Sequence, residues 1–243
     1  MFKERGGGFR RVVLGGIFVD MVKRKYGLKS ISEASETNLL ALDQHLESGS
    51  SVVYFNHTTL IDSPALIAFL LVQLSNIGRI GVLTSEKHYD ISRRPRDGLM
   101  IRSASLIRVN PLRVVQSDDD HYSEQVRFNL NKSMFRQVKK ILGEFGGTIL
   151  IAPEGTRSPN GQLQKAEGEF DRFGKYGNVN FVPIGIIPEG NFDEGIRVGK
   201  VGLNVGEPYR FESLQIPNGL RPIDVAMKRL AGLLLPDMRG AYA

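Results

Sequence analysis

Three short apolar stretches, each followed by a polar or turn-forming residue, limit what this chain can fold into. Ser51–Phe55, Thr148–Ala152 and Phe181–Ile187 are five to seven residues long and rich in β-branched or aromatic side chains, which is typical of buried strands. Between the first two, residues 123–144 carry apolar side chains at near-helical intervals with lysines and arginines between them, which predicts an amphipathic helix. Because strands alternate with helices, we expect an α/β fold with a mixed, largely parallel central sheet flanked by helices.

Shorter patterns predict the remaining elements. Pro183 inside the third apolar stretch suggests a sheet edge, a strand start or a bulge, since proline cannot donate to a ladder. Residues 31–47 read as a loop followed by a short helix. Further predictions are a buried helix at Ala65–Leu74, strands at Ile80–Leu83, Leu106–Ile107 and near Arg197–Val205, a short helix near Ala166–Phe173, and a last amphipathic helix at about Ile223–Leu235.

The first strand leads directly into a pair of residues that suits acid–base chemistry. His57 follows the strand, and Asp62 stands just before Ser63-Pro64, where a helix is expected to begin. On one helix, side chains five positions apart would point about 140° away from each other. With His57 on the turn and Asp62 at the helix start, the carboxylate can instead hold one ring nitrogen while the other accepts a proton. The alternative is an ordinary strand–helix corner with an N-capping aspartate.

A second polar loop, Pro153–Ser158, follows the strand at Thr148–Ala152. Glu154, Gly155, Thr156 and Arg157 supply a carboxylate, a glycine that permits close backbone approach, a hydroxyl and a guanidinium suited to phosphate. Ligands of α/β sheets bind at the carboxyl ends of the strands, so this loop is a candidate anion site. Arg108, beside the end of the short strand at Leu106–Ile107, is a further candidate. The alternative for the loop is a surface Glu154–Arg157 ion pair, which would contribute only ~0–1 kcal/mol.

The distribution of charge points to a membrane surface. The chain has a net charge of +6, and residues 1–29 contain eight Lys or Arg against two acidic residues, so the remainder is neutral. Basic residues bracket the apolar run Val12–Val19, which is too short to cross a bilayer and fits a helix lying in the membrane interface. We therefore expect a basic, amphipathic membrane-surface segment at residues 1–30 and a catalytic domain at residues 31–243. A helix packed on the body with a solvated basic end is the alternative.

Composition also bears on metals and on redox chemistry. The chain has no cysteine, and its four histidines show no metal-ligand spacing, so neither a disulfide nor a metal site is expected. Nothing in this composition conflicts with a reducing cytosol.

With both loops in view, the chain resembles the glycerophospholipid O-acyltransferase family, which includes 1-acylglycerol-3-phosphate O-acyltransferases. The family motif Asn-His-x4-Asp is present at Asn56, His57 and Asp62, and Pro-Glu-Gly-Thr-Arg-Ser is matched in full at Pro153–Ser158. Two weaker likenesses are Leu106-Ile107-Arg108 and Val182-Pro183-Ile184. The four motifs stand in the order of the family and extend over about Val52 to Ile187.

The resemblance implies transfer of a fatty acyl group to the free hydroxyl of 1-acylglycerol 3-phosphate, giving phosphatidic acid. The donor would be acyl-CoA or acyl carrier protein, with no cofactor. His57 would act as general base and Asp62 as its orienting partner, while Arg108, Glu154, Gly155, Thr156 and Arg157 would bind substrate. The implied location is peripheral, on the cytoplasmic face of a membrane with anionic lipids.

Two features depart from the family pattern. Many members carry a lysine pair before a glycine after the third motif, whereas this chain has Ala166-Glu167-Gly168, so Lys165 would have to substitute or the acceptor would differ. Many members also carry transmembrane segments, and none is evident here.

Three other functions compete with this one. Acylation of glycerol 3-phosphate ranks second, because family enzymes for that step often have arginine and serine after the histidine, where this chain has Thr58-Thr59. A non-catalytic lipid- or anion-binding protein would need neither His57 nor Asp62. Nucleic-acid binding is disfavoured, since the charge is concentrated at one terminus and few aromatic residues are available to stack bases.

Overall fold

The computed structural model is built around one central sheet. It describes residues 16–24, 27, 29–30, 32–59, 62–86, 89, 104, 107, 109–116, 121–144, 146–167, 170–176, 178–189 and 200–243. The strands are β1 (Lys29–Ser30), β2 (Ser50–Phe55), β3 (Ile80–Ser85), β4 (Val109–Val114), β5 (Thr148–Ile151), β6 (Val179–Glu189), β7 (Lys200–Val205) and β8 (Tyr209–Arg210). Their order is β1-β7-β6-β2-β5-β3-β4, with β8 paired to β6.

Most neighbouring strands run parallel. Pairs β2–β5, β2–β6, β3–β4, β3–β5 and β1–β7 are parallel, while β7 and β8 run antiparallel to β6. The expected mixed, largely parallel α/β sheet is therefore confirmed. Since β2, β3, β4, β5 and β6 point the same way, their carboxyl ends share one edge of the sheet.

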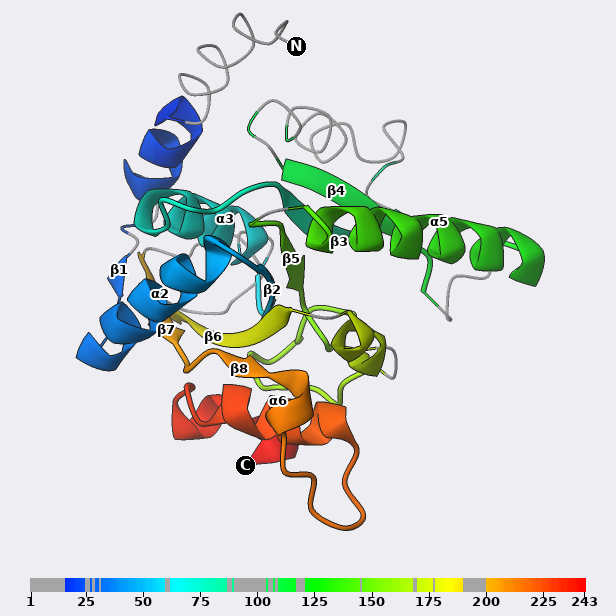
Figure 1. Cartoon of the computed structure of the whole chain (residues 1–243). Coiled ribbons are helices and arrows are strands. Elements are labelled where there is room, and N and C mark those ends of the chain that lie inside the picture. The colour runs from blue at the N-terminus through cyan, green and yellow to red at the C-terminus, as the bar shows by residue number, and fades with distance from the viewer. Residues whose placement is uncertain are drawn as a thin grey trace, which may run out of the picture.

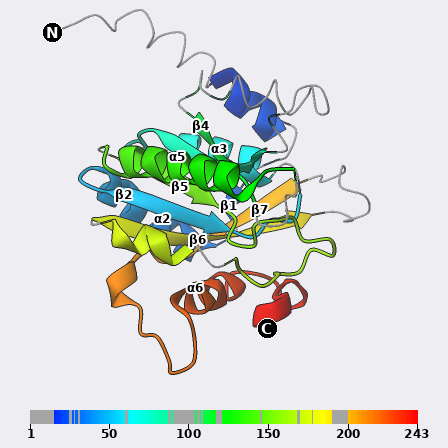
Figure 2. The ribbon, with the colours of Figure 1, turned by 90° about the vertical axis from the view of Figure 1, so that its right-hand side faces the viewer.

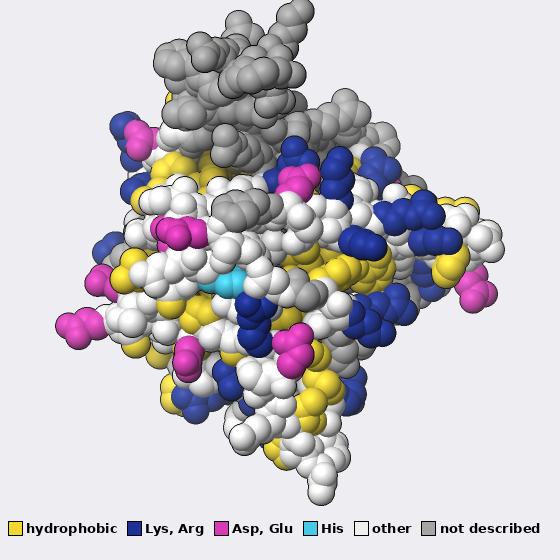
Figure 3. All heavy atoms as spheres, viewed as in Figure 1, with side chains coloured by type: hydrophobic (Ala, Val, Ile, Leu, Met, Phe, Trp, Pro, Cys, Tyr) yellow, Lys and Arg dark blue, Asp and Glu magenta, His cyan; other side chains and the backbone are white. Residues whose placement is uncertain are grey.

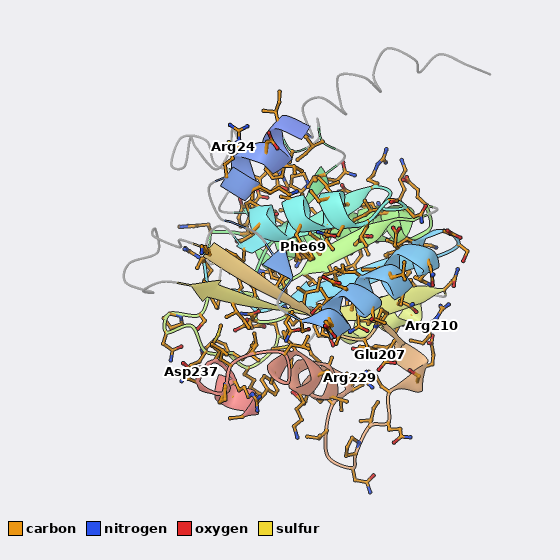
Figure 4. The ribbon with its side chains drawn as sticks, turned by 90° about the vertical axis from the view of Figure 1, so that its left-hand side faces the viewer. Arg24, Phe69, Glu207, Arg210, Arg229 and Asp237 are labelled. Atoms are coloured by element: carbon orange, nitrogen blue, oxygen red, sulfur yellow. The ribbon has the colours of Figure 1, made fainter. Side chains whose placement is uncertain are left out.

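Helices cover both faces of the sheet (Figure 1), namely α2 (Glu33–Leu46), α3 (Asp62–Gln73), α5 (Glu124–Leu142) and α6 (Pro222–Ala231). Alternate residues of β2 point to opposite faces. Val53 and Phe55 join the cluster that contains α2 and α3, whereas Val52 and Tyr54 join the cluster that contains α5 and α6. Phe69 of α3 shows how the first layer is filled, since it is 2% exposed and lies between its helix and the sheet (Figure 4).

Most predicted elements are present, with shifted ends. The helix expected at residues 123–144 is α5, which Ser123 caps by accepting from the Val126 amide, and the helix after Asp62 is α3. The helix expected near Ala166–Phe173 is instead the 3-10 helix η3 at Phe170–Lys175, and the last helix ends at Ala231. The strand expected at Leu106–Ile107 is wrong at Ile107, because the strand, β4, begins only at Val109.

Pro183 corrects another expectation, because it lies inside an internal strand. It pairs with Tyr54 of β2 on one side. On the other side β8 pairs with β6 only up to Phe181, and β7 pairs with β6 only from Ile184. Its carbonyl accepts from the Gly206 amide, between those two strands. The missing N–H of proline therefore falls in a gap of the ladder, where no partner is required.

The N-terminal helix, residues 16–24, lies beside α3 (Figures 1 and 2). Val22 is buried and Phe18 packs on the cluster of α2 and α3, whereas Ile17 and Met21 are 60% and 58% exposed. None of the described helices is both long and apolar enough to cross a bilayer. Val12 to Gly15 of the predicted interfacial run lie outside the described residues, as do most of residues 1–30, so the division at residue 30 stays a prediction.

Candidate active site

Two loops that are far apart in sequence meet at the carboxyl edge of the sheet. His57 follows β2 and Glu154 follows β5, and these strands are direct neighbours with Val53 opposite Leu150. Parallel pairing therefore brings both loops to the same end of adjacent strands. The sheet thus joins two of the motifs identified from sequence.

The imidazole of His57 is oriented by Asp62. Its Nδ1 lies 3.1 Å from Oδ2 of Asp62, the first residue of α3. The His57 side chain is 25% exposed and the Asp62 side chain only 1%. With an Nδ1–H donating to the carboxylate, Nε2 carries the free lone pair. Within the described residues Nε2 has no hydrogen-bond partner, so this nitrogen is available to take a proton from a substrate.

Asp62 is itself held by the turn that separates it from His57. Its Oδ2 accepts from the amides of Thr58 at 2.6 Å and Thr59 at 2.7 Å, and its Oδ1 accepts from the Thr59 hydroxyl at 2.5 Å. These donors keep the buried carboxylate solvated by protein groups and fix its direction. The aspartate therefore shapes the turn at the start of α3 and also orients the histidine.

Glu154 points inward, although the sequence suggested contact with substrate. Its Oε1 accepts from the His57 amide at 2.8 Å and its Oε2 from the Gln164 amide at 2.7 Å. The residue is 2% exposed, and burial raises the pKa of the carboxyl to about 7 even though the two amides favour the charged form. Both oxygens are thus engaged in positioning backbone.

The carbonyl of His57 is held as well. It accepts from the Ser158 amide at 2.7 Å, so Pro153–Ser158 grips the backbone of His57 at both its N–H and its C=O. The histidine is consequently fixed at three points: its ring by Asp62, its amide by Glu154 and its carbonyl by Ser158.

The tip of the second loop turns at Gly155. This glycine has φ +68°, its amide donates to the Ala152 carbonyl at 3.1 Å, and its carbonyl accepts from the Gln116 side chain. Thr156 and Arg157 beyond it are exposed, and neither makes a hydrogen bond or ion pair within the described part of the chain. Their two amides and the guanidinium are therefore open to an anion, whereas the Gly155 amide is already used.

The remaining predicted cation, Arg108, lies outside the described residues. Val109, which follows it, begins β4 at the amino edge of the sheet, opposite the edge that carries His57. Arg113 lies near the carboxyl end of β4, and it was not among the residues predicted from the sequence. The Arg113 guanidinium lies 3.4 Å from Glu86 and 4.3 Å from the centre of the Tyr89 ring. Arg113 stands one residue before the end of β4, and this position at a strand end is the signal that could have identified it.

Segment 162–167 is a second part of the site that the motifs do not mark. Gln164 binds Glu154, and the Glu167 amide donates to the Pro153 carbonyl at 2.8 Å. Lys165, between them, is exposed and makes no ion pair with any described residue. No group of three or more His, Asp or Glu side chains in the described ranges is arranged to hold a metal ion.

Comparison with known proteins gives limited similarity. No family model matches the sequence, and no curated protein sequence matches it. Among solved structures, the 1-acyl-sn-glycerophosphate (LPA) acyltransferase PlsC from Thermotoga maritima is similar over 93% of this chain and 92% of that chain, with 18% identity and a TM-score of 0.48.

Proposed function

We propose that this protein is an O-acyltransferase that moves a fatty acyl group from a thioester to the free hydroxyl of 1-acylglycerol 3-phosphate. The observation that carries the proposal is the oriented His57–Asp62 pair, whose Nε2 has no partner among the described residues. Beside it, the amides of Thr156 and Arg157 and the Arg157 guanidinium likewise bond to no residue that the structure describes. The match of both loops to the acyltransferase motifs supports it. A metal is not needed, because the thioester is already an activated acyl group.

The reaction uses His57 first as base and then as acid. Nε2 takes the proton from the acceptor hydroxyl while the oxygen attacks the thioester carbonyl. The tetrahedral intermediate then expels the thiolate as the new ester forms. The imidazolium, stabilised by Asp62, returns the proton to the thiolate, so CoA or the deacylated carrier protein leaves as the free thiol and the product is phosphatidic acid.

The acceptor phosphate would bind at the tip of the second loop. Arg157 offers a planar guanidinium suited to two phosphate oxygens, and the amides of Thr156 and Arg157, both exposed in the same loop, would add further donors. Lys165 is held close by, because the residue before it is bonded to Glu154. These groups would bind the phosphate head group of the acceptor. A role for Arg108 in substrate binding remains an expectation from the family resemblance.

The N-terminal helix would hold the enzyme on its substrate-bearing surface. Ile17 and Met21 are one helical turn apart, both exposed, and Lys23 and Arg24 follow them. Apolar side chains next to basic ones favour the interface of a membrane with anionic lipids. We propose peripheral attachment at the cytoplasmic face.

Two alternatives remain distinct from this proposal. Acylation of glycerol 3-phosphate would use the same base and phosphate groups, and only the acceptor separates the two reactions. A non-catalytic lipid- or anion-binding protein is less consistent with the site, since phosphate binding alone gives no reason to bury Asp62 against a histidine ring.

A thiol-release assay tests the function. Acyl-CoA and the acylated acyl carrier protein are offered as donors with either 1-acylglycerol 3-phosphate or glycerol 3-phosphate. Because a placed histidine base typically contributes ~10²–10⁴-fold, we expect His57→Ala to lose at least that much of kcat with the fold intact. Asp62→Asn should also lower kcat strongly, whereas Arg157→Gln should mainly raise the KM for the phosphate-bearing acceptor.

Arg79→Gln is the matched control for Arg157→Gln. Arg79 precedes β3 at the amino edge, pairs with Glu144 on the surface, and should be neutral. Turnover only with glycerol 3-phosphate would establish the second candidate, and wild-type kcat in His57→Ala would exclude the proposed mechanism. Vesicle binding without thiol release from any pair would favour the binding protein.

A further inference from the structure

Segment 162–167 positions Glu154 without being a helix or a strand itself. Its Gln164 amide bonds Glu154 and its Glu167 amide bonds Pro153, but the intervening backbone has no regular structure. The position of such a segment depends on what it packs against. The contacts beneath it therefore decide how firmly the glutamate, and through it His57, is held.

Those contacts come from the other end of the chain, Met238–Tyr242, which we call the C-terminal brace. Both backbone groups of Leu163 are bonded to it: the Leu163 amide donates to the Met238 carbonyl at 2.9 Å, and the Leu163 carbonyl accepts from the Ala241 amide at 3.0 Å. The side chains of Leu163 and Met238 are 2% and 5% exposed in the same apolar cluster. Figures 1 and 2 both show the red C-terminal end beneath the yellow-green loop that follows β5.

Tyr242 adds a polar contact that is anchored on α6. Its hydroxyl accepts from the Ala166 amide at 3.1 Å and lies 3.4 Å from Oδ1 of Asp224. Asp224 is in turn held by two bonds of 2.9 Å from the Arg221 guanidinium, at the start of α6. The hydroxyl thus joins segment 162–167 to a packed helix.

Gly240 makes the close approach between the brace and Leu163 geometrically possible. It has φ +50°, and a Cβ at this position would lie 2.3 Å from the Leu163 carbonyl oxygen and 2.9 Å from the Leu163 nitrogen. Backbone atoms cannot move aside as a flexible side chain would. Any side chain at position 240 must therefore push the brace and segment 162–167 apart.

We propose that Tyr242 and Gly240 are positioning residues of the active site, which act through segment 162–167 and Glu154 on the backbone of His57. The chain of contacts runs from Asp224 through Tyr242 to Ala166, from Gln164 to Glu154, and from Glu154 to His57. The catalytic part of this inference rests on the proposed acyl transfer, and the structural part is independent of it.

The first test replaces Tyr242 with phenylalanine. Tyr242→Phe keeps the ring and removes only the hydroxyl, so we expect the Ala166 amide to exchange with solvent faster and the Gln164 amide to lose part of its protection. With the loop less firmly held, kcat should fall about 3- to 10-fold, the size of one hydrogen bond, with little change in the KM of the acceptor. Tyr176→Phe is the matched control, because that hydroxyl has no hydrogen-bond partner among the described residues.

The second test uses glycine. Gly240→Ala should lower kcat by more than tenfold, whereas Gly219→Ala should leave it unchanged. Gly219 also has a positive φ, +85°, but no atom of the described residues lies within 4 Å of its added Cβ. The pair therefore separates backbone strain, which both changes share, from displacement of segment 162–167, which only the first produces.

The pH profile distinguishes positioning from general destabilisation. The Gln164 amide favours the charged form of Glu154, so its withdrawal should raise the pKa of that carboxyl further; the charged or titratable side chains that face Glu154 are those of His57 and Asp62. The acidic limb of kcat against pH should then move to higher pH in Tyr242→Phe and Gly240→Ala. Neither control should shift it.

The inference would be overturned if Tyr242→Phe and Gly240→Ala both kept the wild-type kcat, the wild-type pH profile and the wild-type exchange rate of the Gln164 amide. If the wild-type protein transfers no acyl group, the proposed function fails on its own. The exchange rates of Gln164 and Ala166 then still decide whether the brace holds the segment, since they require no turnover.

Discussion

At the scale of residues, the site is organised by bonds to the backbone of the histidine as much as by the bond to its ring. Glu154 and Ser158 hold the amide and carbonyl of His57, while Asp62 holds Nδ1. A hydrogen bond to a charged group contributes about 1.5–3 kcal/mol, well above the ~0–1 kcal/mol of a surface pair between Glu154 and Arg157. Each inward bond of the charged Glu154 is therefore stronger than a surface pair would be, while burial of the carboxyl opposes its charge.

The raised pKa of Glu154 predicts opposing effects of pH on stability and on activity. Its pKa is about 7 in the folded protein, above the ordinary value of 4.5. The folded state therefore binds the proton more tightly, so the contribution of this group to stability is present below pH 4.5 and is lost as pH rises to 7. The charged form, however, accepts both amides best, so kcat should rise over the same range.

Unfolding measured between pH 5 and pH 8 checks this prediction. The difference in unfolding free energy between wild type and Glu154→Gln should change by about 2–3 kcal/mol over that range, with the wild type losing stability relative to the variant as pH rises. Glu207→Gln, at an exposed position seen in Figure 4, should show no such change. A constant difference for Glu154→Gln would contradict the raised pKa.

At the scale of elements, Asn56 explains how β2 can end while β6 continues beside it. Its Oδ1 accepts from the Ile186 amide at 2.7 Å, and its Nδ2 donates to the Ile186 carbonyl at 2.9 Å. The last backbone pair between these strands is Phe55 with Ile184. The amide side chain thus continues the ladder past the strand end, and the backbone of His57 is free to turn toward Glu154.

Substitution of Asn56 should therefore destabilise the sheet. The residue is 1% exposed, so Asn56→Ala leaves two buried backbone groups unpaired and should cost about 2–4 kcal/mol in unfolding free energy. Asn56→Asp should cost more at pH 8 than at pH 5, because only the protonated acid can donate to the Ile186 carbonyl. Asn218→Asp, in an exposed loop, serves as control. Denaturant titrations at pH 5 and pH 8 measure the cost of each variant in unfolding free energy. An equal cost of Asn56→Asp at the two pH values would exclude a bond from this side chain to the Ile186 carbonyl.

At the scale of the whole molecule, the N-terminal helix and α5 both expose basic side chains to solvent. The N-terminal helix packs on the body through Phe18 and Val22 and leaves Ile17 and Met21 outside, with Arg24 pointing away from the protein (Figure 4). Helix α5 lies on the right of Figure 1, where basic side chains gather in the same view of Figure 3, and its exposed basic residues include Lys132, Arg136 and Lys139. One side of the N-terminal helix therefore packs on the body and the other is exposed, and its attachment to a membrane stays a prediction.

Membrane binding tests this arrangement. The double variant Ile17→Asn, Met21→Asn should lower co-sedimentation with vesicles that contain anionic lipid by at least tenfold, because two apolar side chains are withdrawn from the interface. Thiol release with a water-soluble, short-chain acceptor should be unchanged. Leu40→Asn removes an equally exposed apolar residue, 60%, from α2 and should have no effect on binding. Equal binding of the double variant and wild type would exclude this helix as the attachment site.

Local patterns in the sequence determined the α/β class, the strands β2, β5 and β6, the helices α3 and α5, and the pairing of His57 with Asp62. All of these depend on side chains a few residues apart, so periodicity and spacing suffice to predict them. Only the tertiary structure decided the rest: that Glu154 faces inward, that Pro183 lies in a gap between β7 and β8, that Asn56 continues a ladder, and that Met238–Tyr242 supports segment 162–167. Each of these contacts joins residues that lie far apart in sequence. Such contacts form only when the sheet and the segments packed on it assemble, and no local pattern records which of them become neighbours.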